Sequence, residues 1–415
     1  MTSKPVGYVQ LFRENRNYRY LFGARVVSLF GDWFNLIALL VLLRELGGAS
    51  ATAFGGVLVL KSLPALLVSP TAGAFADRWN RRTIMCWADG LRALTVLGMF
   101  LVVFWPSLWL LYGLVILQTA VGSFFEPALS ASVPQVVSKE ELTAANAAGA
   151  ASWSTMLTIG SALGGLFTAS FGWEWALVVD AASYLISILL LLQIRADLMA
   201  PNGEVDSDGL LGYRAFYEGL RYLLARPRIL SLALVKAAWC LAASTTLLLT
   251  VYGETVFPIW GSTVIGVTGF YVFRGLGTGL GPIVSRSLAG ENQWRMEVLI
   301  GLSFAIGSIA YFGVASAQHV AIALVLVATA HLGGATAWVF STVRIQQTVP
   351  NQLMGRVFAF EQAGFTVTYS LCTALHGYML DAEWLNVRML AATISGGLAL
   401  MAFSWAGRMM VCRQT

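Results

Sequence analysis

Residues 73–82 read Gly-Ala-Phe-Ala-Asp-Arg-Trp-Asn-Arg-Arg and join two long apolar segments, Thr52–Ala76 and Thr83–Phe104. A helix that crosses a bilayer needs about 20 mostly apolar residues, and each segment reaches that length. Charged side chains between the two segments would be costly inside a bilayer, whereas water solvates them readily. The stretch therefore predicts a tight polar turn between two membrane-spanning helices.

The composition supports a membrane protein throughout the chain. Of the 415 residues, 57% are hydrophobic and only 11% are charged, and the mean hydropathy is +0.72. Such a chain has too little polar surface to cover a soluble globule. The net charge of +5 does not indicate nucleic-acid binding, because the basic residues lie in short gaps between apolar runs.

Twelve segments are long and apolar enough to cross a membrane, which predicts an all-α integral membrane protein. They are Tyr18–Leu43, Thr52–Ala76, Thr83–Phe104, Leu108–Val133, Leu142–Ser170, Trp175–Ile194, Ile229–Gly253, Thr263–Leu288, Val298–Ala315, Val320–Val343, Leu353–Leu380 and Leu385–Gly407.

The basic residues predict the orientation of these helices. With the N-terminus inside, 19 of the 26 Lys and Arg residues face the cytoplasm, and only Arg44 and Arg388 face outside. This asymmetry predicts that both termini are cytoplasmic, in a multi-pass protein of a bacterial plasma or inner membrane. The segment before Tyr18 has no apolar stretch of its own, so the first helix is expected to act as the membrane signal.

One long connection divides the twelve segments into two sets of six. Residues 1–194 are expected to form an N-terminal six-helix bundle and residues 229–415 a C-terminal one, joined by a cytoplasmic linker over residues 195–228. The second part of the linker has the pattern of an amphipathic helix that lies on the membrane surface and ends before Pro227. Lys61 and Arg274 occupy corresponding positions in the two halves. Such duplication is typical of transporters that alternate access by rocking two halves around a central site.

The polar turn quoted first matches the GxxxDRxxRR loop motif of the major facilitator superfamily, and the chain resembles that family over nearly its whole length. Further short motifs resemble the subgroup of macrolide efflux proteins and the enterobactin exporter, which is of the drug:proton antiporter type. These motifs are Gly31-Asp32-Trp33, Asp89-Gly90-Leu91-Arg92, Phe125-Glu126-Pro127-Ala128, Val133-Pro134, Ala144-Ala145-Asn146, Val349-Pro350 and Gly355-Arg356-Val357.

The resemblance implies a conformational latch in the polar turn. We expect Gly73 to allow close helix contact and Asp77 to cap the next helix or pair with arginines. The expected latch residues are Gly73, Asp77, Arg78, Arg81 and Arg82. The alternative is that the three arginines only set the topology.

Two positions depart from the pattern of related exporters. Ser161 stands where the antiporter motif GPxxGG of the fifth helix has proline, which weakens the inference of export. The fourth helix has no arginine between Gly113 and Gly122, so the coupling scheme of many proton-driven exporters does not transfer.

Ionisable side chains predicted to lie inside the membrane are the candidates for substrate binding and proton coupling, because they are costly there unless they face a cavity or a partner. The candidates are Asp32, Lys61, Glu126 and Arg274. Asp32 and Lys61 lie at similar depth, so they are expected to pair, either for coupling or as a structural ion pair. Glu126 either carries a proton or anchors an arginine, and Arg274 binds either a substrate anion or a carboxylate of the other half.

Other polar residues receive structural interpretations. Lys236, Arg344 and Glu361 are expected to form a network at the inner gate. Asp180 is placed near the outer end of the sixth helix, in a solvated or capping position, and His331 is expected to be a hydrogen-bonded packing residue rather than a titrating one.

The sequence contains no motif for nucleotide use or catalysis, so we expect no enzyme, no cofactor and no metal. The predicted function is proton-coupled export of an amphipathic small molecule, such as a drug, macrolide or siderophore, by alternating access. The partners would be that substrate, protons and membrane lipids, with no nucleic acid, and the protein is expected to be a monomer. The alternatives are a lysophospholipid transporter, which needs a lateral opening to lipid, and a non-transporting receptor, which would show no counterflow.

Overall fold

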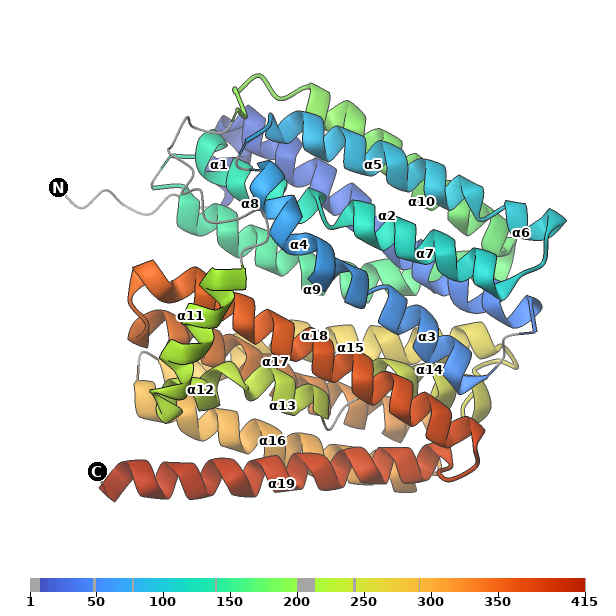
Figure 1. Ribbon diagram of the computed structural model, residues 1–415. Helices are drawn as coiled ribbons and strands as arrows, with labels where there is room; N and C mark the ends of the chain where they lie inside the picture. Colours follow the sequence, from blue (N-terminus) through green and yellow to red (C-terminus); the bar gives the residue numbers. More distant parts are fainter. Residues whose placement is uncertain are drawn as a thin grey trace. The chain divides into compact units, whose positions relative to one another are not determined.

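The computed structural model describes residues 8–47, 50–76, 78–138, 140–199, 213–241, 244–290 and 292–414 (Figure 1). In these ranges the regular secondary structure is helical, as the sequence predicts. The chain divides into two compact units, and each is described by itself. Unit 1 comprises residues 1–49 and 60–211, and unit 2 comprises residues 50–59 and 212–415.

Unit 1 is a helix bundle in which α2 packs on α9 and α10, and α5 packs on α10. Its described helices are α1 (Tyr8–Glu14), α2 (Arg16–Glu45), α4 (Leu63–Ala76), α5 (Arg81–Gly98), α6 (Leu101–Phe104), α7 (Leu108–Gly122), α8 (Phe125–Val136), α9 (Leu142–Phe171) and α10 (Trp173–Leu192).

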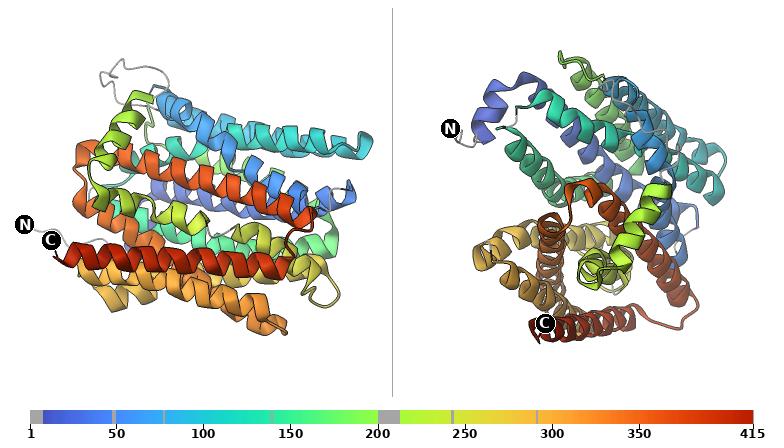
Figure 2. Two further views of the ribbon diagram at one scale, coloured as in Figure 1. Left: turned by 60° about the horizontal axis from the view of Figure 1, so that its bottom comes forward. Right: turned by 60° about the vertical axis from the view of Figure 1, so that its left-hand side comes forward.

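Unit 2 has a similar construction, with α16 packed against both α17 and α19, and α15 against α17. Both views in Figure 2 show α16 running beside the red helix α19. The helices of this unit are α3 (Ala51–Leu60), α11 (Tyr213–Leu224), α12 (Pro227–Ala233), α13 (Val235–Leu241), α14 (Thr245–Thr255), α15 (Thr263–Ala289), α16 (Gln293–Ser316), α17 (Val320–Thr348), α18 (Asn351–Asp381) and α19 (Val387–Gln414).

The described residues contain nine helical segments that are long and apolar enough to cross a membrane. Three of the remaining helices, α9, α15 and α18, have 30, 27 and 31 residues, and at ~1.5 Å per residue each exceeds the ~30 Å of a bilayer core. Together they account for the twelve predicted spans, several of which consist of two shorter helices in line.

Two prolines explain why predicted spans are interrupted. Proline has no N–H to donate to the carbonyl four residues earlier, so a helix weakens at that carbonyl. Pro64 removes the bond to Leu60, where α3 ends, and Pro127 removes the bond to Ser123, between α7 and α8. The helices on either side of each interruption still form single candidate spans, Ala51–Val68 and Leu108–Val136.

The start of α3 belongs to unit 2 because of contacts with α18. The carboxylate of Asp381 accepts hydrogen bonds of 2.8 Å from the backbone N–H groups of Ala51 and Thr52. Both lie in the first turn of α3, whose N–H groups have no partner within the helix. A Cβ on Gly377 would stand 2.9 Å from the Ala51 carbonyl oxygen, so only glycine allows this approach.

The amphipathic helix predicted in the second part of the linker is observed as α11, which packs on α18. The salt bridge between Glu218 and Arg356 and the close approach of Gly219 to the backbone of Arg356 hold it in place. The polar first part of the predicted linker, residues 200–212, lies outside the described residues.

Candidate functional site

An ion pair between Asp32 and Arg92 forms the centre of a polar cluster inside unit 1. The Arg92 guanidinium donates a 2.6 Å hydrogen bond from Nη2 to the Asp32 carboxylate. Asp32 lies on α2 and Arg92 on α5, and their side chains are 32% and 10% exposed. The Tyr184 hydroxyl on α10 donates a second hydrogen bond of 2.7 Å to the same oxygen. Three helices therefore converge on one carboxylate.

Two more carboxylates accompany this pair, and both are fully buried. Asp89 accepts a hydrogen bond of 3.1 Å from Arg92, three residues later on α5. Asp180 on α10 has no side-chain hydrogen bond to any described residue. The expectation that Asp180 is solvated is wrong, because its side chain is fully buried. Asp180 lies on the face of α10 that packs against α2, and this face is buried in the bundle.

The predicted pairing of Asp32 with Lys61 is not observed. Among the described residues, the salt-bridge partner of Asp32 is Arg92, whereas the Lys61 ammonium donates a hydrogen bond of 2.8 Å to the side chain of Asn35. Lys61 still interacts electrostatically with Asp32 and Asp180. Depth along a helix axis does not tell which helix face a side chain occupies.

Glycines allow the helices around this cluster to approach closely. A Cβ on Gly31 would overlap the Ser183 hydroxyl and stand 2.6 Å from the Asp180 carboxylate. A Cβ on Gly160 of α9 would stand 2.8 Å from the Trp33 ring, so the first glycine of the antiporter-like motif packs against the residue that follows Asp32. The α9 helix continues without interruption through this motif.

Glu126 lies at the start of α8, where it forms a salt bridge of 3.5 Å with Arg25 of α2. Its side chain is 58% exposed, so most of its charge is solvated rather than buried. This contact matches the interpretation that Glu126 anchors an arginine, and it leaves proton transfer by Glu126 a prediction.

The polar turn of residues 73–82 is held by its arginines. Arg81 is buried and donates to the carbonyl oxygens of Ala76 and Ala131, at 3.0 and 2.8 Å. Arg82 donates to the Ile194 carbonyl at 2.9 Å, just beyond α10. The carbonyls of Ala76 and Ile194 lie at or just beyond helix C-termini, where a cation is favourable, whereas Ala131 lies within α8.

Three details of the predicted latch differ from expectation or lie outside the structure. The cap of α5 is Asn80, whose side chain accepts from the N–H groups of Arg82 and Thr83, and not Asp77. Asp77 itself lies outside the described residues. Within the described part of the chain, no heavy atom lies within 4 Å of a Cβ built on Gly73, so the expected close helix contact is absent there. Arg78 is exposed.

Arg274 of unit 2 occupies the sequence position that corresponds to Lys61 of unit 1. It lies on α15, half-buried, and donates a hydrogen bond of 2.8 Å to the Thr246 hydroxyl of α14. Its Nε is buried without a hydrogen-bond partner among the described residues. The positive charge of Arg274 also interacts electrostatically with the side chains of Tyr369 and Cys240. In the described part of unit 2, no carboxylate forms a salt bridge with it.

The predicted inner-gate residues belong to two separate ion pairs. Lys236 of α13 and Glu361 of α18 are buried and 2.8 Å apart, and the ammonium also lies 4.5 Å from the ring centre of Trp338. Arg344 of α17 instead binds Glu297 of α16 at 3.0 Å. The expectation of one three-residue network was therefore wrong, because Lys236 and Arg344 bind different carboxylates.

His331 is buried on α17 and lies within 3.1 Å of the Tyr311 hydroxyl of α16. This geometry matches the expected packing role. Among the described residues, no group of three or more His, Cys, Asp or Glu side chains has the arrangement of a metal site.

A helical membrane protein with ionisable groups buried inside each helix bundle has the design of a carrier. The sequence profile of the Major Facilitator Superfamily matches residues 21–371. The chain belongs to this superfamily, and its family and fold are those of multi-pass membrane transporters.

Relatives of the chain are about a quarter identical to it in sequence, and two of them are named as exporters. The MFS-type transporter YfiS of Bacillus subtilis is 25% identical over 94% of this chain and 92% of its own length. BacE of Bacillus subtilis, to which bacilysin export is ascribed, is 25% identical over 86% of both chains. The enterobactin exporter EntS of Escherichia coli is 26% identical over 74% of this chain and 71% of its own. The predicted resemblance to the enterobactin exporter subgroup is confirmed.

Solved structures confirm the fold. A peptide transporter POT in complex with sulfate superposes with a TM-score of 0.75 at 12% identity, covering 98% of this chain and 97% of its own. The nucleoside transporter NupG gives a TM-score of 0.73 at 11% identity, covering 95% and 99%. At these identities, the likeness concerns the fold alone.

Sequence reasoning missed the roles of Arg92, Asp89 and Tyr184. The signal was present for two of them, because Asp89 and Arg92 stand three residues apart in an apolar helix and so lie on one face. Nothing in the sequence pointed to Tyr184, whose hydroxyl becomes informative only when α10 packs on α2.

Proposed function

We propose that the chain is a proton-coupled exporter of amphipathic small molecules that uses Asp32 as its proton carrier. The observation that carries the proposal is the polar cluster of unit 1, defined by Asp32, Asp89, Asp180, Arg92 and Lys61. The exporter names of BacE and EntS support the direction of transport.

The charges of the polar cluster favour the uptake of one proton. The carboxylates of Asp32, Asp89 and Asp180 carry three negative charges. Arg92 and Lys61 carry two positive charges, so one negative charge is uncompensated. An uncompensated charge is costly to bury, whereas a protonated carboxylic acid is much less so. One proton would make the cluster neutral. Asp32 is the best placed to exchange it, because its side chain is 32% exposed while Asp89 and Asp180 are sealed.

A proton on Asp32 would weaken its ion pair with Arg92 and free the guanidinium. Arg92 already contacts Asp89, so it has a second carboxylate partner without leaving its helix. The Arg92 guanidinium also lies over the Tyr184 ring, 4.2 Å from its centre. Protonation would thus change how α2 is bound to α5 and α10, which gives proton binding a direct route to helix movement.

In unit 2, Arg274 is the proposed recognition group for an acidic part of the substrate. Its described polar partner is a neutral hydroxyl, and its Nε remains available as a donor. A guanidinium binds carboxylate or phosphate groups through paired hydrogen bonds. Aromatic and apolar side chains of the same unit would contact the apolar part of the substrate.

The test is transport by the full chain in proteoliposomes with an imposed pH gradient. The substrate is first identified by a screen of amphipathic compounds that includes acidic ones. Asp32→Asn should abolish uphill accumulation and spare downhill exchange of the compound, because the neutral amide keeps hydrogen bonds but carries no proton. Glu14→Gln, which replaces an exposed carboxylate of α1 outside the polar cluster, provides the matched control.

Two further variants sharpen the assignment. Asp180→Asn should retain pH-dependent accumulation, since a sealed carboxylate does not exchange protons with water, and Glu126→Gln should do so as well. If Asp32→Asn still accumulates the compound with an unchanged dependence on the pH gradient, Asp32 is a structural ion-pair residue. A chain that binds compounds but shows no counterflow would instead be a receptor.

A further inference from the structure

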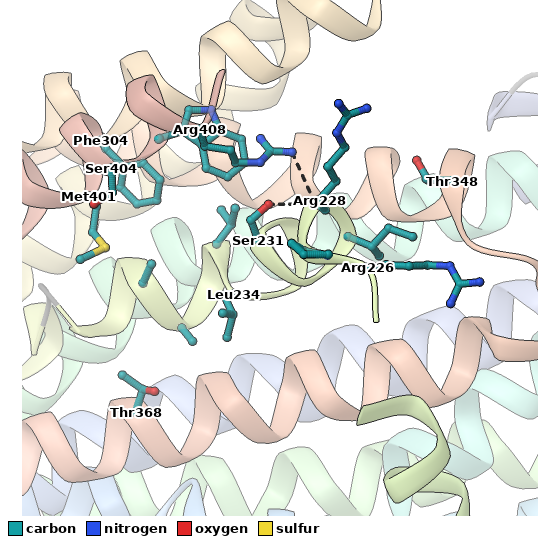
Figure 3. Close-up of a pocket in the computed structure, with 16 residues that line it drawn as sticks. Arg226, Arg228, Ser231, Leu234, Phe304, Thr348, Thr368, Met401, Ser404 and Arg408 are labelled. Atoms are coloured by element: carbon teal, nitrogen blue, oxygen red, sulfur yellow. Dashed lines mark hydrogen bonds between the residues drawn. The ribbon is translucent and has the colours of Figure 1, made fainter. Parts of the chain in front are cut away.

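Unit 2 contains a cavity of about 1100 Å³ that is separate from Arg274 and from the Lys236–Glu361 pair (Figure 3). It lies between α12 and α13 on one side and α19 on the other, with single contributions from α16, α17 and α18. Its walls are mostly apolar and include Leu234, Ala238, Phe304 and Met401. A volume near 1,000 Å³ is sufficient for a drug-sized ligand or a lipid chain.

One end of this cavity is strongly basic. Arg226, Arg228 and Arg408 line it; in Figure 3 a hydrogen bond joins the Arg408 guanidinium to the backbone of Arg228, and the side chains of Arg226 and Arg228 extend in different directions. Of the described residues that line the cavity, none is acidic. Arg226 and Arg228 are exposed at the start of α12, and Arg408 lies near the end of α19.

Arg408 is held in a fixed position by its neighbours. Its guanidinium lies 4.2 Å from the ring centre of Trp405 and 3.3 Å from the Glu297 carboxylate. Glu297 is shared with Arg344, so one negative charge serves two arginines and a positive excess remains. Its Nη2 donates a hydrogen bond of 3.4 Å to the backbone carbonyl of Arg228. The guanidinium is therefore fixed beside the start of α12, at the end of the cavity that Arg226 and Arg228 line.

The basic end lies at the level of the membrane boundary. Helix α12 begins at Pro227, and Arg408 lies six residues before the end of α19 at Gln414. From there the cavity extends along α13 to Ala238 and reaches Thr368, midway along α18. At ~1.5 Å per residue, the path from Arg226 to Ala238 covers roughly 18 Å. A headgroup at the arginines would thus place an acyl chain along the apolar walls.

We propose that this cavity binds one anionic phospholipid, with its phosphate on Arg228 and Arg408 and one acyl chain between α13 and α19. Guanidinium groups bind phosphate oxygens in pairs, and basic pockets between membrane helices select anionic headgroups. A free phosphate would make no use of the apolar walls. A zwitterionic lipid would bring its own cation to three arginines. The site is separate from the proposed carrier chemistry of unit 1 and does not depend on it.

The experiment measures lipid binding to the full-length protein, purified in detergent and stripped of lipid. Native mass spectrometry and thermal unfolding are recorded with phosphatidylglycerol, phosphatidylcholine and glycerol 3-phosphate. Phosphatidylglycerol should bind one to one and raise the Tm, whereas phosphatidylcholine and the free headgroup should do neither. Arg228→Gln should weaken phosphatidylglycerol binding at least about tenfold, as loss of a charge-assisted hydrogen bond implies.

Two variants separate this site from general charge effects. Arg295→Gln removes an exposed arginine of α16 that does not line the cavity, and it should bind phosphatidylglycerol like the wild type. Ala238→Phe fills the apolar part without changing any charge, and it should weaken binding while the Tm without lipid is retained. The proposal is overturned if Arg228→Gln or Ala238→Phe binds normally, or if phosphatidylcholine binds equally well. It is also overturned if the transported compound displaces the lipid, since the cavity would then be a substrate site.

Discussion

Asp32 and Arg92 are 60 residues apart in the chain, yet their charged groups are in direct contact at 2.6 Å inside unit 1. Each belongs to a short motif that resembles the exporter subgroup, Gly31-Asp32-Trp33 on α2 and Asp89-Gly90-Leu91-Arg92 on α5. The structure thus joins two motifs that the sequence leaves unconnected. The contact gives both a common physical role, which is to place a carboxylate and a guanidinium inside a helix bundle.

The stability of unit 1 should depend on Arg92 more than on Asp32. Arg92→Gln leaves three buried or half-buried carboxylates with less compensation, and breaking such a pair costs about 3–5 kcal/mol. We therefore expect a clearly lower Tm in thermal unfolding in detergent. The double variant Arg92→Gln, Asp32→Asn should recover part of the loss, because it removes one of the uncompensated charges. An Arg92→Gln protein as stable as the wild type would contradict the ion-pair account.

Close packing at Gly31 should be sensitive to a single methyl group. Gly31→Ala would drive Cβ into the Ser183 hydroxyl and the Asp180 carboxylate, and overpacking of this kind costs about 1–3 kcal/mol. Gly113→Ala is the matched control, because among the described residues no atom lies within 4 Å of its Cβ position. Thermal unfolding should show a lower Tm for the first variant only. Equal values would mean that α2 and α10 adjust freely.

The Lys236–Glu361 pair should tolerate joint replacement better than single replacement. Lys236→Met leaves Glu361 buried without its partner, which is expected to cost about 3–5 kcal/mol, whereas an apolar pair of similar volume is often neutral or stabilising. The double variant Lys236→Met, Glu361→Leu should therefore be more stable than Lys236→Met alone. Thermal unfolding of the single and double variants measures this difference, and additive effects would argue against a coupled pair.

The polar turn of residues 73–82 is expected to act as a conformational latch through Asp77. Asp77→Asn should lower the transport rate without preventing insertion, because arginines of the turn already bind helix carbonyls and keep it folded. Transport in proteoliposomes and the amount of protein in membranes are measured together. Normal turnover would leave the turn with a purely topological role.

Both termini are expected in the cytoplasm, since 19 of 26 basic residues face inside in that orientation. A reporter that is active only inside the cell, fused after Thr415, should be active. A second reporter that is active only outside should be silent at the same position. The opposite pattern would reverse the orientation of every helix.

The sequence alone determined the class of protein, the twelve spans and the loop motif of the family, because the cost of burying polar groups in lipid leaves a direct trace in hydropathy. It also indicated which charged residues lie deep in the membrane, among them Asp32, Lys61 and Arg274.

Only the tertiary structure decided the partners of these residues. Hydropathy gives depth along a helix axis, but the face of each helix depends on which neighbours pack against it. For that reason Asp32 binds Arg92 and Tyr184 rather than Lys61, and Arg344 binds Glu297 rather than Glu361. Asp180 is sealed for the same reason, because the face of α10 that carries it packs against α2 at Gly31. Pairing within a bundle is a property of helix rotation and contact, which a one-dimensional pattern does not contain.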